Sequence, residues 1–281
     1  MSQVADWVAE QSIPDRMSAA LRDLDVQVRV QAVENLSKCS PEPAIACLIE
    51  LADRDPAQEV RHAALSGLGE LLYVCGASAY DPEADDDALL RYEGLPTEDV
   101  KRAFHFLLEV YHSPERTPQE QRTALEAVSC FANPQVEAAI AELYRRPDKE
   151  SHISALVSMG RNGSSDWLEP LRRNLYHDDH EVQLVAVLAA GELGHEALGK
   201  DLLHLTYAPD RELMMAALWS LGQTAWEGAF DRLDECTLHA DPEVSEVADE
   251  ALDEWLFFTG LEATDMDAGP ANDAPDDLDL E

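Results

Sequence analysis

The chain has 281 residues, of which 46% are hydrophobic, and its 57 acidic residues outnumber its 20 basic ones to give a formal net charge of −37. No apolar run approaches the roughly 18 residues of a membrane span, and the dense negative charge repels phosphate backbones. We therefore expect neither a membrane protein nor direct nucleic-acid binding. Five scattered cysteines without a CxxC pair, and an N-terminus without a signal peptide, favour the reducing cytoplasm.

Two explanations of the net charge stay open. A dense acidic surface keeps a protein hydrated at high salt, and it also attracts a specific basic partner. The chain has only four lysines against sixteen arginines, and so low a share of lysine resembles proteins of salt-loving microbes. The composition by itself does not choose between the two explanations.

A short phrase recurs about every 31 residues along most of the chain. Residues 1–12 are expected to form an N-terminal cap, and the repeats then extend over residues 13–257. The clearest copy of the phrase runs from Val60 to Gly69, with Ala64 at its centre. The related copies centre on Ala32, Ala124, Ala155, Ala186, Ala217 and Ala251. This period predicts an all-α, right-handed α-solenoid of about seven helical pairs, each pair burying its apolar face against its neighbours.

The first helices of the pairs are predicted from apolar residues at helical spacing. These residues are Ile45, Leu48 and Leu51; Val136, Ile140 and Leu143; Trp167, Leu168, Leu171 and Leu175; and Phe230 and Leu233. The second helices carry the repeated phrase, and several begin after an aspartate that suits an N-cap, as at Asp55, Asp179 and Asp241.

Two segments interrupt the period. Residues 74–96 include Asp81, Glu83, Asp85, Asp86 and Asp87 and are predicted to be an acidic loop inserted between the second and third pairs. No Lys or Arg follows Arg232, and residues 258–281 lack periodicity, so they are predicted to form a disordered acidic tail. Such a tail either keeps the protein soluble or binds a partner.

The stretch from Asp55 to Gly69, with its Asp-Pro and Val-Arg pairs, resembles HEAT repeats in the short form shared with phycobilisome-lyase-type repeat proteins. The resemblance implies the solenoid fold, and such repeats serve scaffolds, adaptors, chaperones and a few enzymes. It also implies a ladder of Asp and Arg, expected here only early, as Asp25 with Arg29 and Asp55 with Arg61. The later Arg positions are Gln121, His152, Gln183, Met214 and Ala248. The later repeats are therefore expected to be held mostly by packing.

Two enzymatic interpretations come from HEAT-like relatives. Deoxyhypusine hydroxylase, an iron enzyme, uses His-Glu pairs placed symmetrically in its repeats, but His62 is followed by Ala63. The two His-Glu pairs at His180 and His195 are out of phase with each other, and carboxylates at a helix start typically complement its dipole. A bilin lyase subunit would be expected to have more aromatic repeat helices. We therefore predict no catalytic residue, no metal and no cofactor, with these enzymes as the alternative.

The most specific functional prediction concerns two positions of the second helices, those of His62 and Ser66, called here the inner positions. A helical wheel places them off the buried arc. They hold Val30 and Glu34, then His62 and Ser66, and finally Asp249 and Asp253. Between these, they hold Ile153, Val157, Leu184, Leu188, Met215 and Trp219. An acidic row lies beside them: Glu59, Glu150, Glu181, Glu212 and Glu246.

Six apolar inner residues beside glutamates indicate a groove with an apolar floor and an acidic rim. The alternative is that they only widen the core. A groove of this kind suits a basic, amphipathic protein segment. We therefore predict a non-catalytic interaction scaffold or adaptor that binds its partner through Ile153, Val157, Leu184, Leu188, Met215 and Trp219, with Glu150, Glu181 and Glu212 at the rim.

Overall fold

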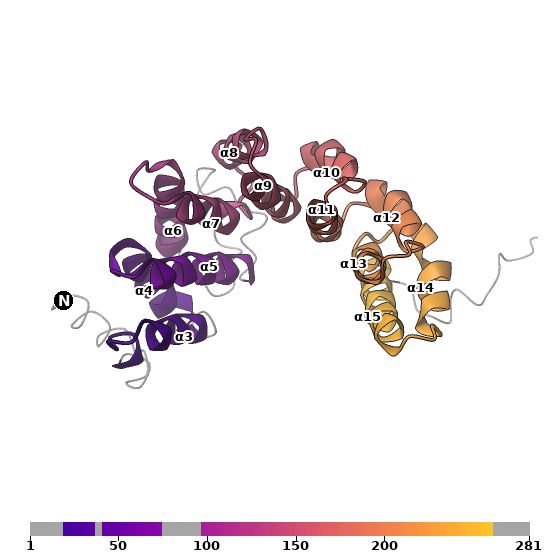
Figure 1. Cartoon of the computed structure of the whole chain (residues 1–281), viewed down its shortest axis with the longest axis horizontal. Coiled ribbons are helices and arrows are strands. Elements are labelled where there is room, and N and C mark those ends of the chain that lie inside the picture. The colour runs from indigo at the N-terminus through magenta and orange to yellow at the C-terminus, as the bar shows by residue number, and fades with distance from the viewer. Residues whose placement is uncertain (1–18, 37–40, 75–96, 261–281) are drawn as a thin grey trace, which may run out of the picture. The chain divides into compact units, whose positions relative to one another are not determined.

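The computed structural model describes residues 19–36, 41–74 and 97–260. Within these ranges the chain forms thirteen α-helices, three short 3-10 helices and no strand (Figure 1). They belong to two compact units, one ending at Leu193 and the other beginning at Gly194. The predicted cap at residues 1–12, nearly all of the acidic loop, and residues 261–281 of the predicted tail lie outside the described residues.

The first unit contains most of the helices. They are α3 (Val26–Leu36), α4 (Pro41–Arg54), α5 (Gln58–Val74), α6 (Thr97–His112), α7 (Pro118–Val128), α8 (Pro134–Tyr144), α9 (Lys149–Asn162), a 3-10 turn (Ser165–Trp167), α10 (Leu168–Asn174) and α11 (His180–Leu193). The helices α5, α7, α9 and α11 each pack on the helix before them, and α3, α5, α7, α9 and α11 contact one another in that order. The unit is therefore a stack of helical pairs.

The second unit repeats this arrangement. Its elements are a 3-10 turn (Glu196–Leu198), α12 (Gly199–Leu205), α13 (Arg211–Gly222), a 3-10 turn (Glu227–Ala229), α14 (Phe230–Thr237) and α15 (Pro242–Thr259). Helix α12 packs on α13, α14 packs on α15, and α13 contacts α15. The described residues thus hold six helical pairs, and α3 is the second helix of another. The all-α solenoid of about seven pairs is confirmed.

The helices begin where local capping chemistry predicts. Thr117 forms a capping box with Glu120 at the start of α7, and the side chains of Asp148, Asp210 and Asp241 accept backbone N–H groups at the starts of α9, α13 and α15. These oxygens satisfy N–H groups that have no partner within the helix. Helix α15 ends at Thr259, two residues beyond the predicted end of the repeats.

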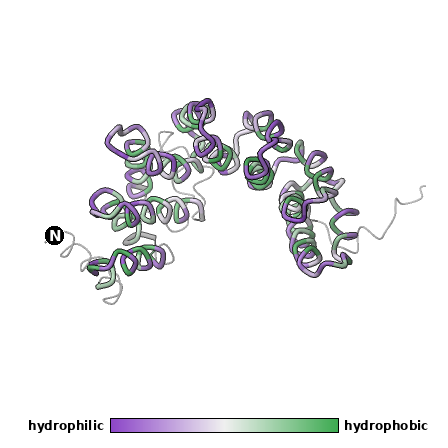
Figure 2. Tube along the Cα trace, in the orientation of Figure 1, coloured by the Kyte–Doolittle hydropathy of each residue, from purple (hydrophilic) through white to green (hydrophobic). Residues whose placement is uncertain are grey.

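The repeated phrase forms the packed side of the second helices. Ala64, Leu65 and Leu68 are fully buried, and so are Ala186 and Ala217. Hydrophobic and hydrophilic stretches alternate along the helices of each unit (Figure 2), as amphipathic helices require. The hydrophobic side of each pair is thereby removed from water.

Glycines in the phrase allow the second helices to approach closely. A Cβ atom on Gly160 of α9 would lie 2.8 Å from the carbonyl oxygen of Ala189 in α11. A Cβ atom on Gly222 of α13 would lie 2.4 Å from the carbonyl oxygen of Ala251 in α15. Both distances are shorter than any side chain tolerates, so glycine is required by the backbone of the next repeat.

The same glycine contacts correct the sequence assignment of α15. Gly222 packs on Ala251 as Gly160 packs on Ala189, so Ala251 corresponds to Ala189 and not to the centre of the phrase. The fully buried Ala248 takes that central position instead. The error has a simple cause, because residues three apart lie on one side of a helix and both are alanine.

A hydrogen bond supports this register. The Ser245 hydroxyl of α15 donates to the Thr237 carbonyl eight residues earlier, and the Gln183 amide of α11 donates in the same way to the Leu175 carbonyl. Ser245 therefore occupies the ladder position that the sequence assigned to Ala248. The inner positions of α15 are correspondingly Glu246 and Glu250, not Asp249 and Asp253.

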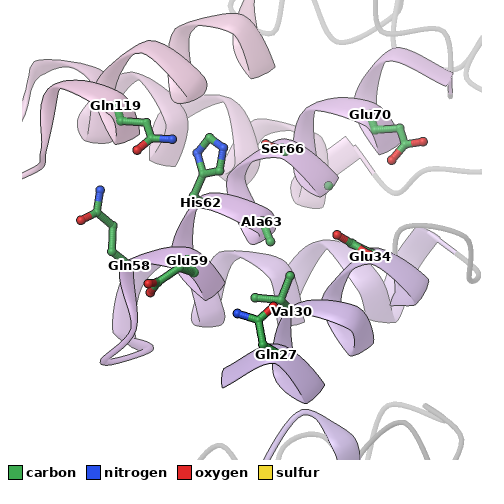
Figure 3. Close-up of a pocket in the computed structure, with 11 residues that line it drawn as sticks. Gln27, Val30, Glu34, Gln58, Glu59, His62, Ala63, Ser66, Glu70 and Gln119 are labelled. Carbon is green, nitrogen blue, oxygen red and sulfur yellow. The ribbon is translucent and has the colours of Figure 1, made fainter. Parts of the chain in front are cut away.

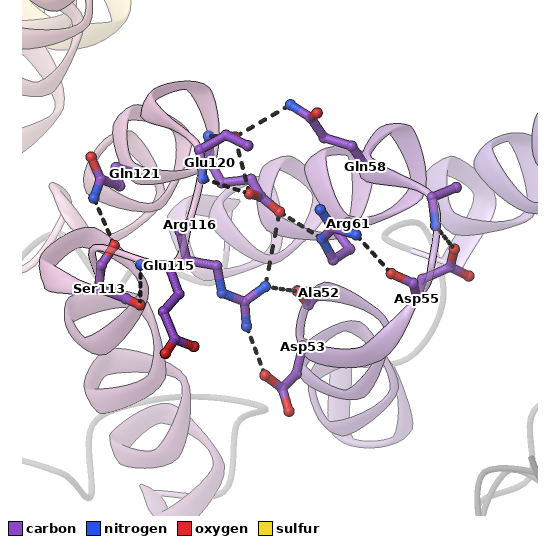
Figure 4. Close-up of polar contacts among 12 residues, drawn as sticks. Ala52, Asp53, Asp55, Gln58, Arg61, Ser113, Glu115, Arg116, Glu120 and Gln121 are labelled. Atoms are coloured by element: carbon purple, nitrogen blue, oxygen red, sulfur yellow. Dashed lines mark hydrogen bonds and ion pairs between the residues drawn. The ribbon is translucent and has the colours of Figure 1, made fainter.

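The Asp/Arg ladder connects neighbouring repeats. Arg29 donates to the two carboxylate oxygens of Asp55 at 3.0 and 2.9 Å, and Arg61 donates to the carboxylate of Glu120 at 2.6 Å (Figure 4). Arg61 also donates to the Asp55 backbone carbonyl at 2.9 Å. The expected partner of Arg29, Asp25, is thus corrected to Asp55 of the next repeat.

Glu120 is the most buried carboxylate of this ladder, with 1% of its side chain exposed. Burial alone would raise its pKa, but hydrogen bonds from Arg61 and Thr117 lower it overall. Arg116 lies 3.9 Å from the same carboxylate and bonds Asp53 at 2.7 Å (Figure 4). Glu120 is therefore held ionised inside a network that joins two repeats.

Later repeats carry a second kind of bridge, which the sequence pattern did not reveal. In the first unit, Lys149 of α9 bonds the Asp179 carboxylate before α11 at 2.8 Å. In the second unit, Arg211 of α13 bonds the N-cap Asp241 of α15 at 2.6 Å. Both bridges are solvent-exposed, and exposed ion pairs contribute little to stability. Packing remains the main force between these repeats.

Candidate protein-binding surface

A cleft of about 800 Å³ opens between α3 and α5 in the first unit. Its lining residues come from these two helices, with Gln119 from the start of α7 (Figure 3). They are Gln27, Val30, Glu34, Gln58, Glu59, His62, Ala63, Ser66, Gly67, Glu70 and Gln119. The cleft is therefore polar and acidic, with small residues of α5 on its wall.

All four inner residues of α3 and α5 line this cleft, namely Val30, Glu34, His62 and Ser66. His62 is held by a contact of 3.1 Å between its Nδ1 and the Thr123 hydroxyl of α7. In these early repeats, the two inner positions thus face open space rather than the core.

The equivalent residues of α7 are less open. Glu126 corresponds to Ser66 and is half-buried. Burial raises the pKa of the Glu126 carboxyl, and nearby Ser154 and Arg161 only partly offset this effect. Glu126 therefore belongs to the interior edge of the repeat more than to an exposed acidic rim.

In α9 and α11 the inner positions are apolar and incompletely covered. Ile153, Val157 and Leu184 are partly exposed, and Leu188 is 39% exposed. By contrast, Leu156 on the packed side of α9 is fully buried. The four inner side chains therefore differ from the core, although each also has a covered portion.

Two predicted rim residues lie in this unit, and both are exposed. Glu150 is in the first turn of α9 and Glu181 is in the first turn of α11. Glu181 forms an ion pair with Lys149 at 2.8 Å, so part of its charge is already balanced. Glu150 has no such partner among the ion pairs of the described residues.

The second unit carries the remaining predicted residues. Met215 and Trp219 of α13 are partly exposed, and Glu212 is exposed. Trp219 lines a hollow of about 500 Å³ with four residues of α15: Glu250, Asp253, Glu254 and Phe257. The sequence singled out Trp219 but missed Glu250 and Phe257, because the shifted register of α15 hid their relation to it.

The segments that contain the two His-Glu pairs, at His180 and His195, form turns and helix caps. The Asp179 carboxylate accepts backbone N–H groups of Glu181 and Val182, and His177 Nδ1 accepts the N–H of Asp179 at 3.0 Å. His195 caps a 3-10 turn through Ala197. Across the described ranges, no three His, Cys, Asp or Glu residues gather in a way that could hold a metal ion.

The described cysteines are buried. Burial raises the pKa of the Cys47 and Cys130 thiols to about 12, and it also raises the pKa of Cys236. These thiols are protonated at neutral pH and so are poor nucleophiles. Cys39 and Cys75 lie outside the described residues.

None of the helices in the described ranges combines the length and the apolar composition that a membrane span requires.

Residues 168–253 match the family model of HEAT repeats, and no curated protein matches the chain. Among solved structures, the complex of CpcE and CpcF of phycocyanin lyase from Nostoc sp. PCC7120 is 17% identical, with a TM-score of 0.54 over 87% of this chain and 95% of that chain. Human deoxyhypusine hydroxylase in complex with glycerol is 15% identical, with a TM-score of 0.36 over 90% and 98%.

The archaeal HEAT-like repeats protein from Thermococcus onnurineus NA1 is 13% identical, with a TM-score of 0.40 over 90% of this chain and 96% of that chain. At 17% identity the phycocyanin lyase structure speaks to the fold alone. Together with the family match, it confirms the resemblance to HEAT repeats.

Proposed function

We propose that this chain with HEAT-like repeats is a non-catalytic interaction scaffold that binds a basic, amphipathic protein segment on the inner positions of its second helices. A repeat stack presents an extended surface made of equivalent positions, and binding then needs no catalytic group. The proposed contacts are Ile153, Val157, Leu184, Leu188, Met215 and Trp219, with Glu150, Glu181 and Glu212 beside them.

One observation carries the proposal. The inner positions line an open cleft in α3 and α5, and in α9 and α11 the same positions hold apolar side chains that stay partly exposed. Apolar residues that merely filled the core would be covered like Leu156. Partly exposed apolar residues in register suit anchors for a partner's apolar side chains.

The charge of the chain supports a basic partner. With a net charge of −37, the chain attracts cations over a long range and repels acidic competitors. Exposed glutamates at the starts of α9, α11 and α13 would then place this attraction beside the apolar anchors. Apolar contacts would supply affinity, and the charges would supply orientation and speed of association.

The test is a capture experiment with matched variants. Immobilised protein is incubated with native lysate at native salt, and bound proteins are identified by mass spectrometry. We expect the double variant Leu188→Ala, Trp219→Ala to lose the bound partner. The control Leu238→Ala also truncates an exposed apolar side chain (88% exposed), but one away from the inner positions, and should keep the partner.

Folding is checked by thermal melting. Leu221 is fully buried, so Leu221→Ala should destabilise the fold by about 2–5 kcal/mol. The double variant should melt close to the wild type. If it melts as low as Leu221→Ala, the inner residues belong to the core. If it retains the same partner, the inner residues do not bind it. Either result makes the proposed function wrong.

A further inference from the structure

The hollow beside Trp219 combines aromatic and acidic side chains. Trp219 comes from α13, while Glu250, Asp253, Glu254 and Phe257 come from α15. Residue 250 is the inner position that follows residue 219, and residues 254 and 257 lie about one and two turns further along α15. The hollow therefore joins aromatic and acidic side chains of two neighbouring second helices.

Its aromatic surface is exposed to water. Phe257 is 79% exposed, and the one ring contact it makes within the described residues is an edge contact with Phe258, at 5.5 Å between centroids. Trp219 is partly exposed, whereas the nearby Trp255 is fully buried and its indole N–H donates to the Trp226 carbonyl at 2.9 Å. Trp219 and Phe257 thus keep ring surface available, although covering it would be favourable.

Its acidic charge is not balanced from within the unit. Glu250, Asp253 and Glu254 form no ion pair with any other residue in the described ranges. Both arginines of the second unit are engaged elsewhere. Arg211 bonds Asp241, and Arg232 bonds the Thr206 carbonyl at 2.9 Å and lies 3.9 Å from the centre of the Tyr207 ring.

From this arrangement, we propose that the hollow of Trp219, Glu250, Asp253, Glu254 and Phe257 is a subsite for one arginine side chain of the bound segment. This subsite rests on the proposed function, and it specifies which side chain of the bound segment the surface recognises. A guanidinium group stacks on an aromatic face and donates in its own plane to carboxylates. Lysine offers a compact, strongly hydrated ammonium and loses the planar contact, so arginine is preferred.

The test uses a defined probe, the peptide Ac-Gly-Gly-Arg-Gly-Gly-NH2, titrated into the full chain. Binding is followed by the indole N–H resonance of Trp219, which the variant Trp219→Phe identifies among the five tryptophans. The matched peptide with citrulline has the same shape without the charge and should bind at least about tenfold more weakly. The lysine peptide should bind between the two.

Variants separate a built subsite from general attraction by the acidic surface. Phe257→Ala and Glu254→Gln should each weaken binding of the arginine peptide severalfold. Two controls match them: Leu238→Ala removes another exposed apolar side chain, and Asp249→Asn removes another exposed carboxylate of α15 that does not line the hollow. Both controls should bind like the wild type, and melting temperatures check that all four variants fold.

Three results would overturn the subsite: equal binding of the citrulline peptide, equal weakening by Asp249→Asn and Glu254→Gln, or no shift of the Trp219 resonance. Failure of the subsite can be distinguished from failure of the proposed function. A Glu250→Gln, Glu254→Gln variant that still captures the lysate partner while the peptide test fails rejects the subsite alone. Loss of capture is judged separately by Leu188→Ala alone, because Leu188 does not line the hollow.

Discussion

Asp241 shows how one carboxylate can serve two elements. It caps α15 by accepting the N–H of Glu243 at 3.0 Å, and it bonds Arg211 of the preceding second helix at 2.6 Å. Arg211 is the main reason that the pKa of Asp241 falls to about 2, and the backbone N–H groups lower it further. In the first unit, Asp179 and Lys149 repeat the arrangement, and the pKa of Asp179 is lowered as well.

We predict that Arg211→Ala raises the pKa of Asp241 from about 2 toward its ordinary value, measured by NMR of the carboxyl carbon. Because the folded pKa is depressed, this contact stabilises the fold above the unfolded pKa of about 3.9. That stabilisation is lost as the pH falls toward 2. Arg232→Ala is the control and should leave Asp241 unchanged. An Asp241 pKa that stays near 2 in Arg211→Ala would assign the shift to the backbone instead.

Neighbouring second helices approach through glycine and alanine. Gly69 of α5 faces Ala127 of α7, just as Gly160 faces Ala189. The spacing leaves no room for a methyl group, so the backbones of successive repeats pack directly on each other. The equivalent contact of Gly222 with Ala251 sets the register of α15. The periodic pattern alone placed the centre of the phrase about one helical turn too far along the chain, at Ala251 instead of Ala248.

We predict that Gly160→Ala lowers the free energy of unfolding by about 1–3 kcal/mol, as overpacking does. The sign is informative, because glycine to alanine in an open helix raises stability by about 0.5–1 kcal/mol. Ser66→Ala on the exposed side of α5 should change little. Urea unfolding followed by circular dichroism measures all three proteins. A gain in stability for Gly160→Ala would show that the helices can separate at no cost.

At the scale of the whole molecule, charge repulsion acts against the compact fold. The 57 acidic residues face only 20 basic ones, and many bases are already paired in the ladder and the bridges. The Debye length falls from about 10 Å at 0.1 M salt to about 3 Å at 1 M. Screening therefore weakens repulsion between exposed carboxylates more than it weakens the buried pair of Arg61 and Glu120.

We predict that the melting temperature rises from low salt to molar KCl if the acidic surface is adapted to high salt. Differential scanning calorimetry across the range measures the rise. Potassium sulfate at matched ionic strength is the comparison: screening gives the same rise in both salts, and any excess in sulfate comes from exclusion of that anion from the protein surface. A melting temperature that stays flat would remove the high-salt explanation and leave a specific basic partner as the reason for the charge.

Much of the fold follows from local features that a single chain displays. Helix starts at Asp148, Asp210 and Asp241 come from capping, and the buried faces come from helical spacing of apolar residues, both set within a few residues. The inner positions followed from the same spacing, and Val30 and His62 indeed line a cleft. Their role in binding stays a prediction, because exposure does not identify a ligand.

Contacts between repeats depended on the tertiary structure. Arg29 reaches Asp55 of the next repeat, and Trp219 shares its hollow with Phe257, because stacking brings together residues roughly one repeat apart. The period predicts that such neighbours exist, but a slip of one helical turn leaves the pattern nearly unchanged while replacing every lateral partner. The close approach of Gly222 to Ala251 and the hydrogen bond of Ser245 to the Thr237 carbonyl remove that ambiguity. Sequence thus determined the helices and their packed faces, and backbone contact between repeats determined which side chains meet.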